Sequence, residues 1–338
     1  MPAPFRVLIT DYMWHSLEIE KTILEEVGAE LIVAETGDEV ELLTLASAAN
    51  VILTCWKPVT SKVLDVAKRC LAVGRYGIGL DNIAVDHATE LGILVTNIPD
   101  YCLDEVSDHT LALILACARN IARFTRETHH GIWDLSKGSS MRRLRGKTLG
   151  LVGYGKIARK LTPKALALGF KVIAYDILFS STEEIQPSVI ATHDLEYLLR
   201  AADYISLHVP LTEKTHFLID AHAFKLMKPT AFLINTSRGA IIDETDLYQA
   251  LTEGWIAGAA IDVLVQEPPD KSYPLFSCDN LIATPHAAFY SIEAIEELEQ
   301  RAALQAVEVL RGRIPPNIVN PIVMGRDNFR LRKLEQLI

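Results

Sequence analysis

Three short polar segments in the second half of the chain carry side chains that could act together in catalysis. Each follows a short apolar run typical of a buried strand in a parallel sheet. The segments are Asn235-Thr-Ser-Arg238-Gly239, Asp262-Val-Leu-Val-Gln-Glu267-Pro268 and Thr284-Pro-His286. Because open α/β sheets bind ligands at the carboxyl ends of their strands, we expect these segments to meet at one site.

The residue types in these segments fit the transfer of a hydride to a carbonyl group that lies beside a carboxylate. The guanidinium of Arg238 can bind that carboxylate with two hydrogen bonds and polarise the carbonyl. His286 can donate a proton to the developing alkoxide, and Glu267 can orient the imidazole. Asp262 is expected to face the carboxamide of a nicotinamide cofactor. Taken singly, Arg238 could instead be a cation at a helix end, His286 an ordinary loop histidine and Glu267 an exposed carboxylate in a turn.

The other histidines fit this chemistry less well. His208 ends a predicted strand, where it could line a cofactor site or have a purely structural role. His109, His129 and His130 lie on or after a long predicted helix, where we expect packing or surface positions. Because no histidine pair has HExxH or another metal-ligand spacing, we expect no metal site.

A glycine-rich segment has the pattern of a dinucleotide site. Gly153, Gly155 and Ala158 form a GxGxxA motif between a predicted strand and a predicted helix. Gly153 permits the tight turn, Gly155 lets the backbone approach a pyrophosphate, and Ala158 allows close packing of the helix on the strand. The N-terminus of the helix offers N–H groups and a positive dipole to the phosphates.

Asp176 lies 21 residues after Gly155, at the end of the next predicted strand. A carboxylate at this position can accept hydrogen bonds from the ribose hydroxyls. The same charge repels a 2′-phosphate, and no arginine follows within residues 177–179, so the sequence favours NAD over NADP. A structural glycine turn beside a surface aspartate is the alternative interpretation.

Short apolar strands alternate with helical patterns along most of the chain, which predicts parallel sheets covered by helices. The expected strands are Val7–Ile9, Leu31–Ala34, Val51–Thr54, Ala72–Arg75, Ile93–Thr96, Thr148–Val152, Val172–Tyr175, Tyr204–His208, Phe232–Asn235, Gly258–Asp262 and Leu281–Ala283. Helical patterns cover Ser16–Val27 and Ser61–Lys68. In the second series, Asp220 and Asp243 are expected to cap helices.

Two longer helical patterns stand apart from this alternation. One runs from about Leu103 to His129 and the other from about Ile292 to Arg311. We interpret both as crossovers between two lobes, with the chain after Gly312 returning to the first lobe. The stretch Trp133–Arg145 between them has no clear periodicity and is expected to be a surface loop or an oligomer arm.

The composition of the 338 residues indicates a globular protein of about two domains. The net charge of −10 argues against a surface built to bind nucleic acid. The longest apolar run, Leu111 to Ala118, is far shorter than the roughly 20 residues of a membrane span. The first residues, Met1-Pro-Ala-Pro, lead directly into a strand, so we expect no signal peptide. Five dispersed cysteines without a CxxC pair indicate reduced thiols in the cytoplasm.

With these motifs in this order, the sequence resembles the D-isomer-specific 2-hydroxyacid dehydrogenase family over nearly its whole length. Gly74-Arg-Tyr-Gly-Ile-Gly79-Leu-Asp-Asn-Ile adds to the resemblance. Within the family, the chain is most similar to the C-terminal-binding-protein-like branch, through Thr284-Pro-His-Ala-Ala-Phe-Tyr-Ser291 and Gly312-Arg-Ile-Pro315. The resemblance implies two doubly wound parallel-sheet lobes with a cleft between them. They are a flavodoxin-like substrate-binding domain (1–98 and 300–338) and a Rossmann NAD-binding domain (99–299).

The resemblance also assigns roles to single residues. By motif match, Arg238, Glu267 and His286 carry catalysis. The implied cofactor contacts, together with the motif residues, are Thr110, Gly153, Gly155, Lys156, Ile157, Asp176, Val209, Pro210, Thr215, Thr236, Ser237, Asp262 and Ala288. The implied substrate contacts are Arg75, Gly77, Ile78 and Gly79, with Trp56, Tyr76, Tyr101 and Phe289 as candidate pocket walls. The family further implies a homodimer formed through the NAD-binding lobes and the segment after the first crossover helix.

The sequence therefore predicts an NAD-dependent oxidoreductase that interconverts a small 2-oxo acid and a D-2-hydroxy acid, without nucleic-acid or membrane partners. Phe289 departs from the branch, which carries tryptophan there, and this weakens any transfer of the branch's substrate preference. One alternative is an NAD(H)-gated dimeric binding module of the corepressor type. Another is a dehydrogenase of a phosphorylated or phosphonate hydroxy acid, for which Arg75, Arg238 and Lys57 would supply positive charge.

Overall fold

The computed structural model describes residues 5–180 and 186–335, and it divides into two compact units that are described one at a time. The discontinuous unit comprises Met1–Tyr101 and Ser291–Ile338, and the continuous unit comprises Cys102–Tyr290. Met1–Pro4, on which the expectation of no signal peptide rests, lie outside the described residues. Along the described chain, no helix is long and apolar enough to cross a bilayer.

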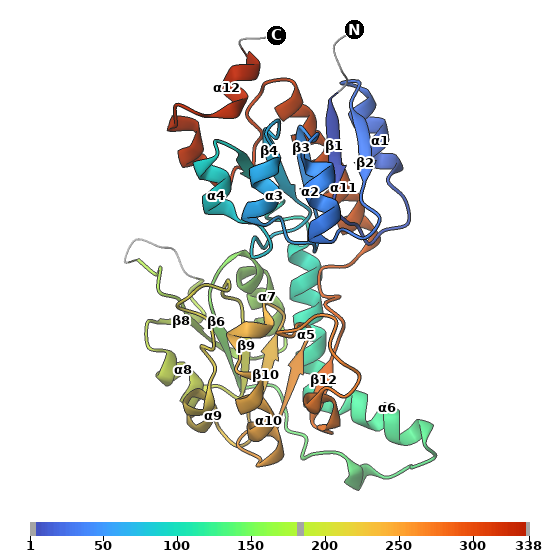
Figure 1. Ribbon diagram of the computed structural model, residues 1–338. Coiled ribbons are helices and arrows are strands. Elements are labelled where there is room, and N and C mark those ends of the chain that lie inside the picture. The colour runs from blue at the N-terminus through green and yellow to red at the C-terminus, as the bar shows by residue number, and fades with distance from the viewer. Residues whose placement is uncertain (1–4, 181–185, 336–338) are drawn as a thin grey trace. The chain divides into compact units, whose positions relative to one another are not determined.

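A five-stranded parallel sheet forms the centre of the discontinuous unit (Figure 1). Its strands are β1 (Arg6–Ile9), β2 (Glu30–Val33), β3 (Val51–Thr54), β4 (Ala72–Arg75) and β5 (Leu94–Thr96). Their order, β2-β1-β3-β4-β5, is the flavodoxin-like order that the resemblance implied. All five predicted strands are confirmed to within one residue at either end, because their apolar runs are almost wholly buried in β1, β3, β4 and β5.

Helices cover this sheet and enclose an apolar core. They are α1 (Glu18–Glu25), α2 (Glu39–Ala46), α3 (Ser61–Val66), α4 (Val85–Glu90), α11 (Ile292–Leu310) and α12 (Arg330–Glu335), with the short 3-10 helix η4 (Pro321–Gly325). The core includes Leu8, Leu42, Ile52 and Val73, which are fully buried. The predicted helices Ser16–Val27 and Ser61–Lys68 are present in shorter form, and the second crossover pattern is confirmed as α11.

The chain after Gly312 returns to the discontinuous unit, as predicted. Asn320 Oδ1 accepts a hydrogen bond from the backbone N–H of Val95 at 2.8 Å. The Asn320 amide also donates to Thr89 Oγ1 at 2.8 Å and to the carbonyl of Ile93 at 3.0 Å. Since Asn320 is almost fully buried, these bonds fix the tail to β5 and α4.

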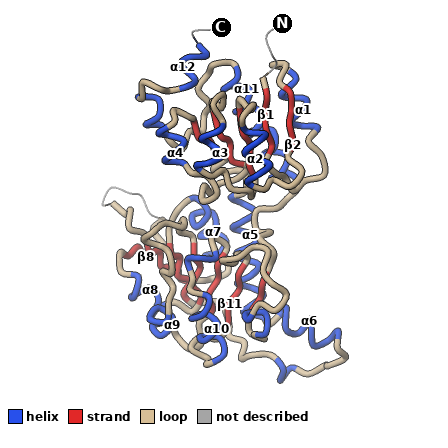
Figure 2. Tube along the Cα trace, viewed as in Figure 1, coloured by secondary structure: helices blue, strands red, loops and turns tan. Residues whose placement is uncertain are grey.

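The continuous unit is built around a seven-stranded parallel sheet (Figure 2). Its strands are β6 (Thr148–Val152), β7 (Lys171–Tyr175), β8 (Val189–Thr192), β9 (Tyr204–Leu207), β10 (Phe232–Asn235), β11 (Gly258–Ile261) and β12 (Leu281–Ala283). The order is β12-β11-β10-β9-β6-β7-β8, a Rossmann arrangement with one added edge strand. The strand order reverses between β6 and β9, which is where such sheets bind dinucleotides.

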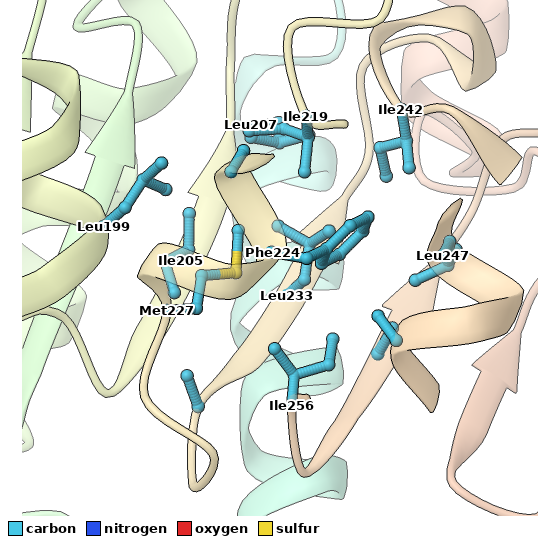
Figure 3. Packing of buried hydrophobic residues seen from close by; sticks show 14 of the residues in the cluster. Leu199, Ile205, Leu207, Ile219, Phe224, Met227, Leu233, Ile242, Leu247 and Ile256 are labelled. Atoms are coloured by element: carbon cyan, nitrogen blue, oxygen red, sulfur yellow. The ribbon is translucent and has the colours of Figure 1, made fainter. Parts of the chain in front are cut away.

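Helices lie on both faces of this sheet. They are α5 (Leu103–Arg119), α6 (Ile121–His129), α7 (Lys156–Ala167), α8 (Leu195–Ala201), α9 (Ala221–Leu226) and α10 (Glu244–Thr252), with the 3-10 helices η1 (Leu135–Lys137), η2 (Gly239–Ile241) and η3 (Pro274–Ser277). As predicted, Asp220 caps α9 by accepting from Ala223 N, and Asp243 caps α10. Phe224 is fully buried in the core under α8, α9 and α10 (Figure 3), whereas Leu161 packs in the core under α5 and α7.

Two features of this unit were predicted incorrectly. Strand β8 was not predicted, because it is an edge strand in which only Val189 is buried while Ile190 and Ala191 are exposed. The expected single helix Leu103–His129 is two helices, α5 and α6, separated by Asn120. Asn120 adopts a left-handed conformation with φ of 54°, which asparagine tolerates better than most residues. Its side chain also bonds Ser139 at both Nδ2 and Oδ1, which anchors the segment that follows α6.

Candidate active site

Glu267 and His286 meet at the carboxyl edge of the seven-stranded sheet. Glu267 follows β11 and His286 follows β12, and the Nδ1 atom of His286 lies 2.6 Å from Oε2 of Glu267. The other carboxylate oxygen, Oε1, accepts the N–H of Leu264 at 2.8 Å. Because Glu267 bonds Nδ1, Nε2 is the ring nitrogen that could exchange a proton with a substrate.

The Glu267 carboxylate is held in its ionised form. Burial by itself would raise its pKa, but the hydrogen bond and charge of His286, the Leu264 N–H and the charge of Arg238 outweigh that effect and lower the pKa. The side chains of His286 and Glu267 are 22% and 32% exposed. The pair is therefore partly shielded from water yet accessible to a small molecule.

Asp262 anchors the loop that carries His286. Its backbone carbonyl accepts the N–H of His286 at 2.8 Å. Its buried carboxylate accepts the N–H groups of Ala287 and Ala288, both at 2.9 Å, and the hydroxyl of Thr284 at 2.5 Å. His286 itself has a φ of 51°, which is uncommon for a residue with a side chain. The bonds to Asp262 hold this conformation, and they add an anchoring role to the predicted cofactor contact.

Arg238 and Gly239 connect the loop after β10 to the Glu267 loop. Arg238 Nη1 donates to the carbonyl of Ser237 at 2.7 Å, and the amide of Asn235 donates to the carbonyl of Arg238 at 2.8 Å. A Cβ atom on Gly239 would lie only 2.0 Å from the carbonyl carbon of Leu264. The two loops therefore touch backbone to backbone, so that the Arg238 loop and the Glu267 loop are fixed relative to each other.

The structure also shows one contributor that the sequence did not indicate. Glu244, at the start of α10, accepts the N–H of Val265 at 2.9 Å and the hydroxyl of Tyr273. Both contacts lie in the loop that carries Glu267. The sequence placed Glu244 only in the first turn of a helix, where an acidic residue is ordinary, so no signal pointed to this role.

The glycine-rich loop has the geometry that a pyrophosphate needs. Gly153 has a φ of 91°, and a Cβ there would lie 2.8 Å from the backbone carbonyl of His208. Beside Gly155, by contrast, no atom lies within 4 Å of a built Cβ, so the backbone is open to a ligand at that point. Gly155 precedes α7, which begins with Lys156 and Ile157 and carries no side-chain cap at its N-terminus. Ala158, in the first turn of α7, is fully buried, which allows the close packing of helix on strand that the motif predicts. The residues present therefore fit a bound dinucleotide.

Asp176 lies beside this loop, at the end of β7. Its Oδ2 atom accepts the N–H of Tyr154, and its Oδ1 atom accepts the N–H of Leu178, both at 2.8 Å. Each carboxylate oxygen has a further lone pair for a ribose hydroxyl. The backbone bonds thus fix the orientation of Asp176 next to the glycine turn, as the motif required.

The remaining predicted cofactor residues of the continuous unit line the same sheet edge. Thr110 Oγ1, on α5, donates to the carbonyl of Val106 and lies 2.9 Å from Thr236 Oγ1. Ser237 Oγ donates to the carbonyl of Leu207 at 2.7 Å. In the loop after β9, Thr215 Oγ1 donates to the carbonyl of Pro210 at 2.6 Å.

Two further predicted cofactor residues belong to this edge. Val209 packs against the Gly153 turn, and Ala288 bonds Asp262. Direct cofactor contact by the whole set stays a prediction.

The predicted substrate residues of the discontinuous unit also gather at a sheet edge. Arg75 ends β4, is 7% exposed, and has its guanidinium carbon 5.6 Å from the centre of the Trp56 ring. Gly77 and Ile78 are held through their carbonyls by Ile98 N and the Asn97 amide. The Nη1 atom of Arg75 donates to the carbonyl of Tyr76, whereas its buried Nε atom has no hydrogen-bond partner among the described residues.

The other candidate wall residues are mostly covered. Tyr76 is fully buried and Tyr101 nearly so, whereas Gly79 is half-buried. In the continuous unit, Phe289 is 9% exposed, and its ring lies edge-on to that of His286 at 6.1 Å. Phe289 therefore packs against His286, and its role in binding substrate stays a prediction.

The remaining histidines occupy different surroundings. His208 bonds Ser206 at 2.9 Å, and burial lowers the pKa of its imidazole to about 4, so it is neutral. His129 and His130 are exposed and bond backbone carbonyls of α6. Within residues 5–180 and 186–335 there is no group of three or more His, Cys, Asp or Glu side chains that could hold a metal. The expected absence of a metal site stays a prediction.

Comparisons with known proteins show which family this chain is similar to. The family model of the NAD-binding domain of D-isomer-specific 2-hydroxyacid dehydrogenases matches residues 111–288. A D-3-phosphoglycerate dehydrogenase from Methanocaldococcus jannaschii is 40% identical over 316 residues, which are 93% of this chain but only 59% of that protein. A glyoxylate reductase from Korarchaeum cryptofilum is 38% identical over 79% of this chain and 81% of its own length. The solved D-lactate dehydrogenase from Aquifex aeolicus, in complex with NAD and lactic acid, superposes with a TM-score of 0.83 at 27% identity and covers 93% of this chain and 98% of its own.

Proposed function

The chain belongs to the D-isomer-specific 2-hydroxyacid dehydrogenase family of oxidoreductases, and from this premise we propose that it reduces a small 2-oxo acid to a D-2-hydroxy acid with NADH. The observation that carries the proposal is the Glu267–His286 pair beside Arg238, at the same sheet edge as the Gly153–Gly155 turn. That arrangement joins a proton donor, a cation and a dinucleotide loop on one scaffold.

Each residue of the trio has a defined task in this reaction. When bound, the reduced cofactor supplies a hydride to the carbonyl carbon. Arg238 binds the carbonyl oxygen and carboxylate of the substrate, which stabilises the negative charge that develops on that oxygen. His286 donates a proton from Nε2 to the oxygen, and Glu267 stabilises the resulting charge states of the imidazole through Nδ1. In the opposite direction, His286 removes the hydroxyl proton.

Arg75 supports an anionic substrate. Its nearly buried guanidinium keeps an Nε donor without a hydrogen-bond partner in the described chain, and a substrate carboxylate is the simplest group to satisfy it. The N–H groups of Gly77, Ile78 and Gly79 follow directly and could add to that anion site. Replacement of Arg75 by Met should therefore raise KM for the oxo acid. The affinity for NADH should change by a smaller factor.

Asp176 supports NAD in preference to NADP. Its orientation is fixed by the N–H groups of Tyr154 and Leu178, so a 2′-phosphate would meet a carboxylate that cannot easily turn away. The change Asp176→Ser should reduce the ratio of NADH to NADPH efficiency by at least about tenfold. An unchanged ratio would show that the preference comes from elsewhere.

A substrate panel tests the reaction itself. NADH oxidation would be followed with glyoxylate, pyruvate, hydroxypyruvate and longer 2-oxo acids, and the product's configuration would be determined. We expect turnover with at least one acid and a loss of about 10²-fold or more in kcat for His286→Ala. The matched control is His222→Ala, because His222 is 70% exposed on α9 and lies outside the site. Full activity of His286→Ala, or no turnover with any acid, would refute the proposal.

A phosphorylated hydroxy acid is the second candidate substrate. It is favoured by the 40% identity to a protein named D-3-phosphoglycerate dehydrogenase, and Lys57 with Arg75 could supply the extra charge. Competition between phosphorylated and plain acids would distinguish the two. The finer resemblance to the C-terminal-binding-protein-like branch, and the corepressor-type module it suggests, stay predictions.

We also propose that the enzyme is a cytoplasmic homodimer. The free state of all five cysteines supports a reducing compartment. Helix α6 has no buried residue and extends away from the sheet of the continuous unit (Figure 1), and the segment after it exposes Trp133 at 92% and Leu135 at 74%. Large exposed apolar side chains on a projecting segment favour a second copy as their partner.

A further inference from the structure

His109 lies directly behind the loop that carries the catalytic histidine. It is on α5, a helix of the same continuous unit, and its Nε2 atom is 3.1 Å from Oγ1 of Thr284. The same Nε2 atom is 3.5 Å from Oδ1 of Asp262. The Asp262 side chain is fully buried, whereas that of His109 is 24% exposed. The imidazole therefore reaches from the helix to the buried carboxylate that anchors His286.

The direction of these hydrogen bonds follows from their chemistry. The Asp262 carboxylate is acceptor-only while ionised, so the single hydroxyl proton of Thr284 is donated to it. Thr284 Oγ1 must then accept from His109, which requires a proton on Nε2 of the imidazole. Both the neutral Nε2–H tautomer and the imidazolium satisfy this condition. The result is a directed chain from His109 through Thr284 to Asp262.

This chain ends at the backbone of the catalytic loop. The two Asp262 oxygens also accept the N–H groups of Ala287 and Ala288, the residues that follow His286. A carboxylate that rotates would release those N–H groups and the left-handed backbone of His286 together. His109 therefore restricts the Asp262 carboxylate at Oδ1, the oxygen that also accepts the N–H of Ala287.

We propose that His109 is a positioning residue for the reaction, which acts through Thr284 and Asp262 to hold His286 in its reactive position. The inference rests on the proposed function, since it assigns His286 the proton transfer. A packing role alone would need only the volume of the ring. Packing would not require an N–H at Nε2, whereas the Thr284 hydroxyl accepts a hydrogen bond from that N–H.

Two variants of His109 separate positioning from packing. His109→Leu keeps most of the volume and removes the donor, whereas His109→Gln retains an N–H at nearly the same reach. We expect kcat to fall about tenfold to a hundredfold in His109→Leu with KM for the oxo acid changed less than about threefold, and a large part of kcat to return in His109→Gln. The exposed His222→Leu is the control. Equal activity of the two His109 variants, or wild-type kcat in His109→Leu, would overturn the proposal.

A double-mutant cycle tests the route through Thr284. Thr284→Val removes the hydroxyl that links His109 to Asp262. If His109 acts through that hydroxyl, adding His109→Leu to Thr284→Val should lower kcat by less than about twofold further. Full additivity of the two losses would mean that His109 acts by another route, and the proposal would be wrong.

A measurement without turnover keeps the test independent of the proposed reaction. The backbone amide signals of Ala287 and Ala288 report their bonds to Asp262 in the full-length protein by NMR. We expect both signals to move or broaden in His109→Leu and to return toward wild-type positions in His109→Gln. Unchanged signals in His109→Leu would overturn the positioning role even if no 2-oxo acid were reduced. Moved signals without turnover would leave the positioning intact and refute only the proposed substrate class.

Discussion

Glu267 and His286 are 19 residues apart in the chain, yet their side chains are joined by a contact of 2.6 Å between Oε2 and Nδ1. The loops that hold them follow neighbouring strands β11 and β12, so the parallel sheet brings the pair together. The interaction lowers the pKa of the Glu267 carboxyl against the opposing effect of its burial.

The change Glu267→Gln removes that charge while keeping an acceptor for Nδ1. We expect kcat to fall by about 10²-fold, because an amide cannot stabilise the charge that develops on the imidazole during proton transfer. Steady-state kinetics would measure kcat and KM. Wild-type kcat in Glu267→Gln would mean that an acceptor for Nδ1 is enough and that the charge of Glu267 is not required.

The close approach of Gly239 to the backbone of Leu264 leads to a second prediction for the same site. Its Cβ would lie 2.0 Å from the carbonyl carbon of Leu264, and backbone atoms cannot yield as the end of a flexible side chain can. Gly239→Ala should therefore displace the loop that carries Glu267, reduce kcat at least about tenfold, and cost about 1–3 kcal/mol of unfolding free energy. Gly325→Ala is the matched control, since nothing lies within 4 Å of its Cβ. Wild-type kinetics in Gly239→Ala would contradict the proposed contact between loops.

Much of the fold could be predicted from the sequence because buried parallel strands leave a strong apolar pattern. Strands β9 and β10, for example, are nearly wholly buried and were predicted within one residue. Polar residues that follow such strands, including Arg238, Glu267 and His286, could be assigned to one edge for the same reason. The pairing of Glu267 with His286 thus followed from strand order, although the distance between them did not.

The parts that were missed depend on contacts that the sequence pattern does not encode. Edge strand β8 exposes Ile190, so its burial pattern differs from that of a central strand. The break at Asn120 depends on a single residue whose left-handed backbone is stabilised by Ser139, 19 residues later. Glu244 and His109 lie on helices, where their residue types are ordinary, and only tertiary packing brings them to the catalytic loops.

Substitutions at the two glycines of the dinucleotide motif, Gly153 and Gly155, should have different effects on stability and on NADH binding. Gly155 has an ordinary extended backbone and open space beside it, so Gly155→Val should leave the thermal stability of the cofactor-free protein within about 2 °C while abolishing NADH binding. Gly153 has a positive φ and a close contact with His208, so Gly153→Val should also lose about 1–3 kcal/mol of stability. Calorimetry and NADH fluorescence would measure the two effects. Equal destabilisation by both variants would contradict this assignment.

The exposed Trp133 and Leu135, in the segment after α6, lead to a prediction about the oligomeric state. If Trp133 and Leu135 bury against a second copy, the double change Trp133→Asp and Leu135→Asp should convert a dimer into monomers. Sedimentation velocity of the wild type and the variant would measure this directly. Val40→Asp serves as control, because Val40 is 77% exposed on α2 and belongs to the discontinuous unit. A monomeric wild type, or a dimer unaffected by the double change, would rule out this interface.

A pair of buried carboxyl groups connects α1 to α11 in the discontinuous unit. Glu20 is fully buried and Glu299 is 5% exposed, and Tyr76 donates its hydroxyl to Glu20 at 3.1 Å. Burial and the neighbouring Glu20 raise the pKa of Glu299 from 4.5 to about 8, and burial also raises that of Glu20. At neutral pH the pair therefore retains at least one proton in the folded state.

This pair makes the stability of the fold depend on pH. Between about pH 4.5 and pH 8 the unfolded chain loses the Glu299 proton while the folded chain keeps it, so stability falls as pH rises. Glu299→Gln retains a neutral hydrogen-bonding group and has no proton to lose. Its Tm should match that of the wild type near pH 5 and exceed it by several degrees near pH 9, as thermal unfolding would measure. Glu25→Gln, on the exposed side of α1, should follow the wild type throughout. Parallel loss of Tm in Glu299→Gln and the wild type would show that the proton resides elsewhere.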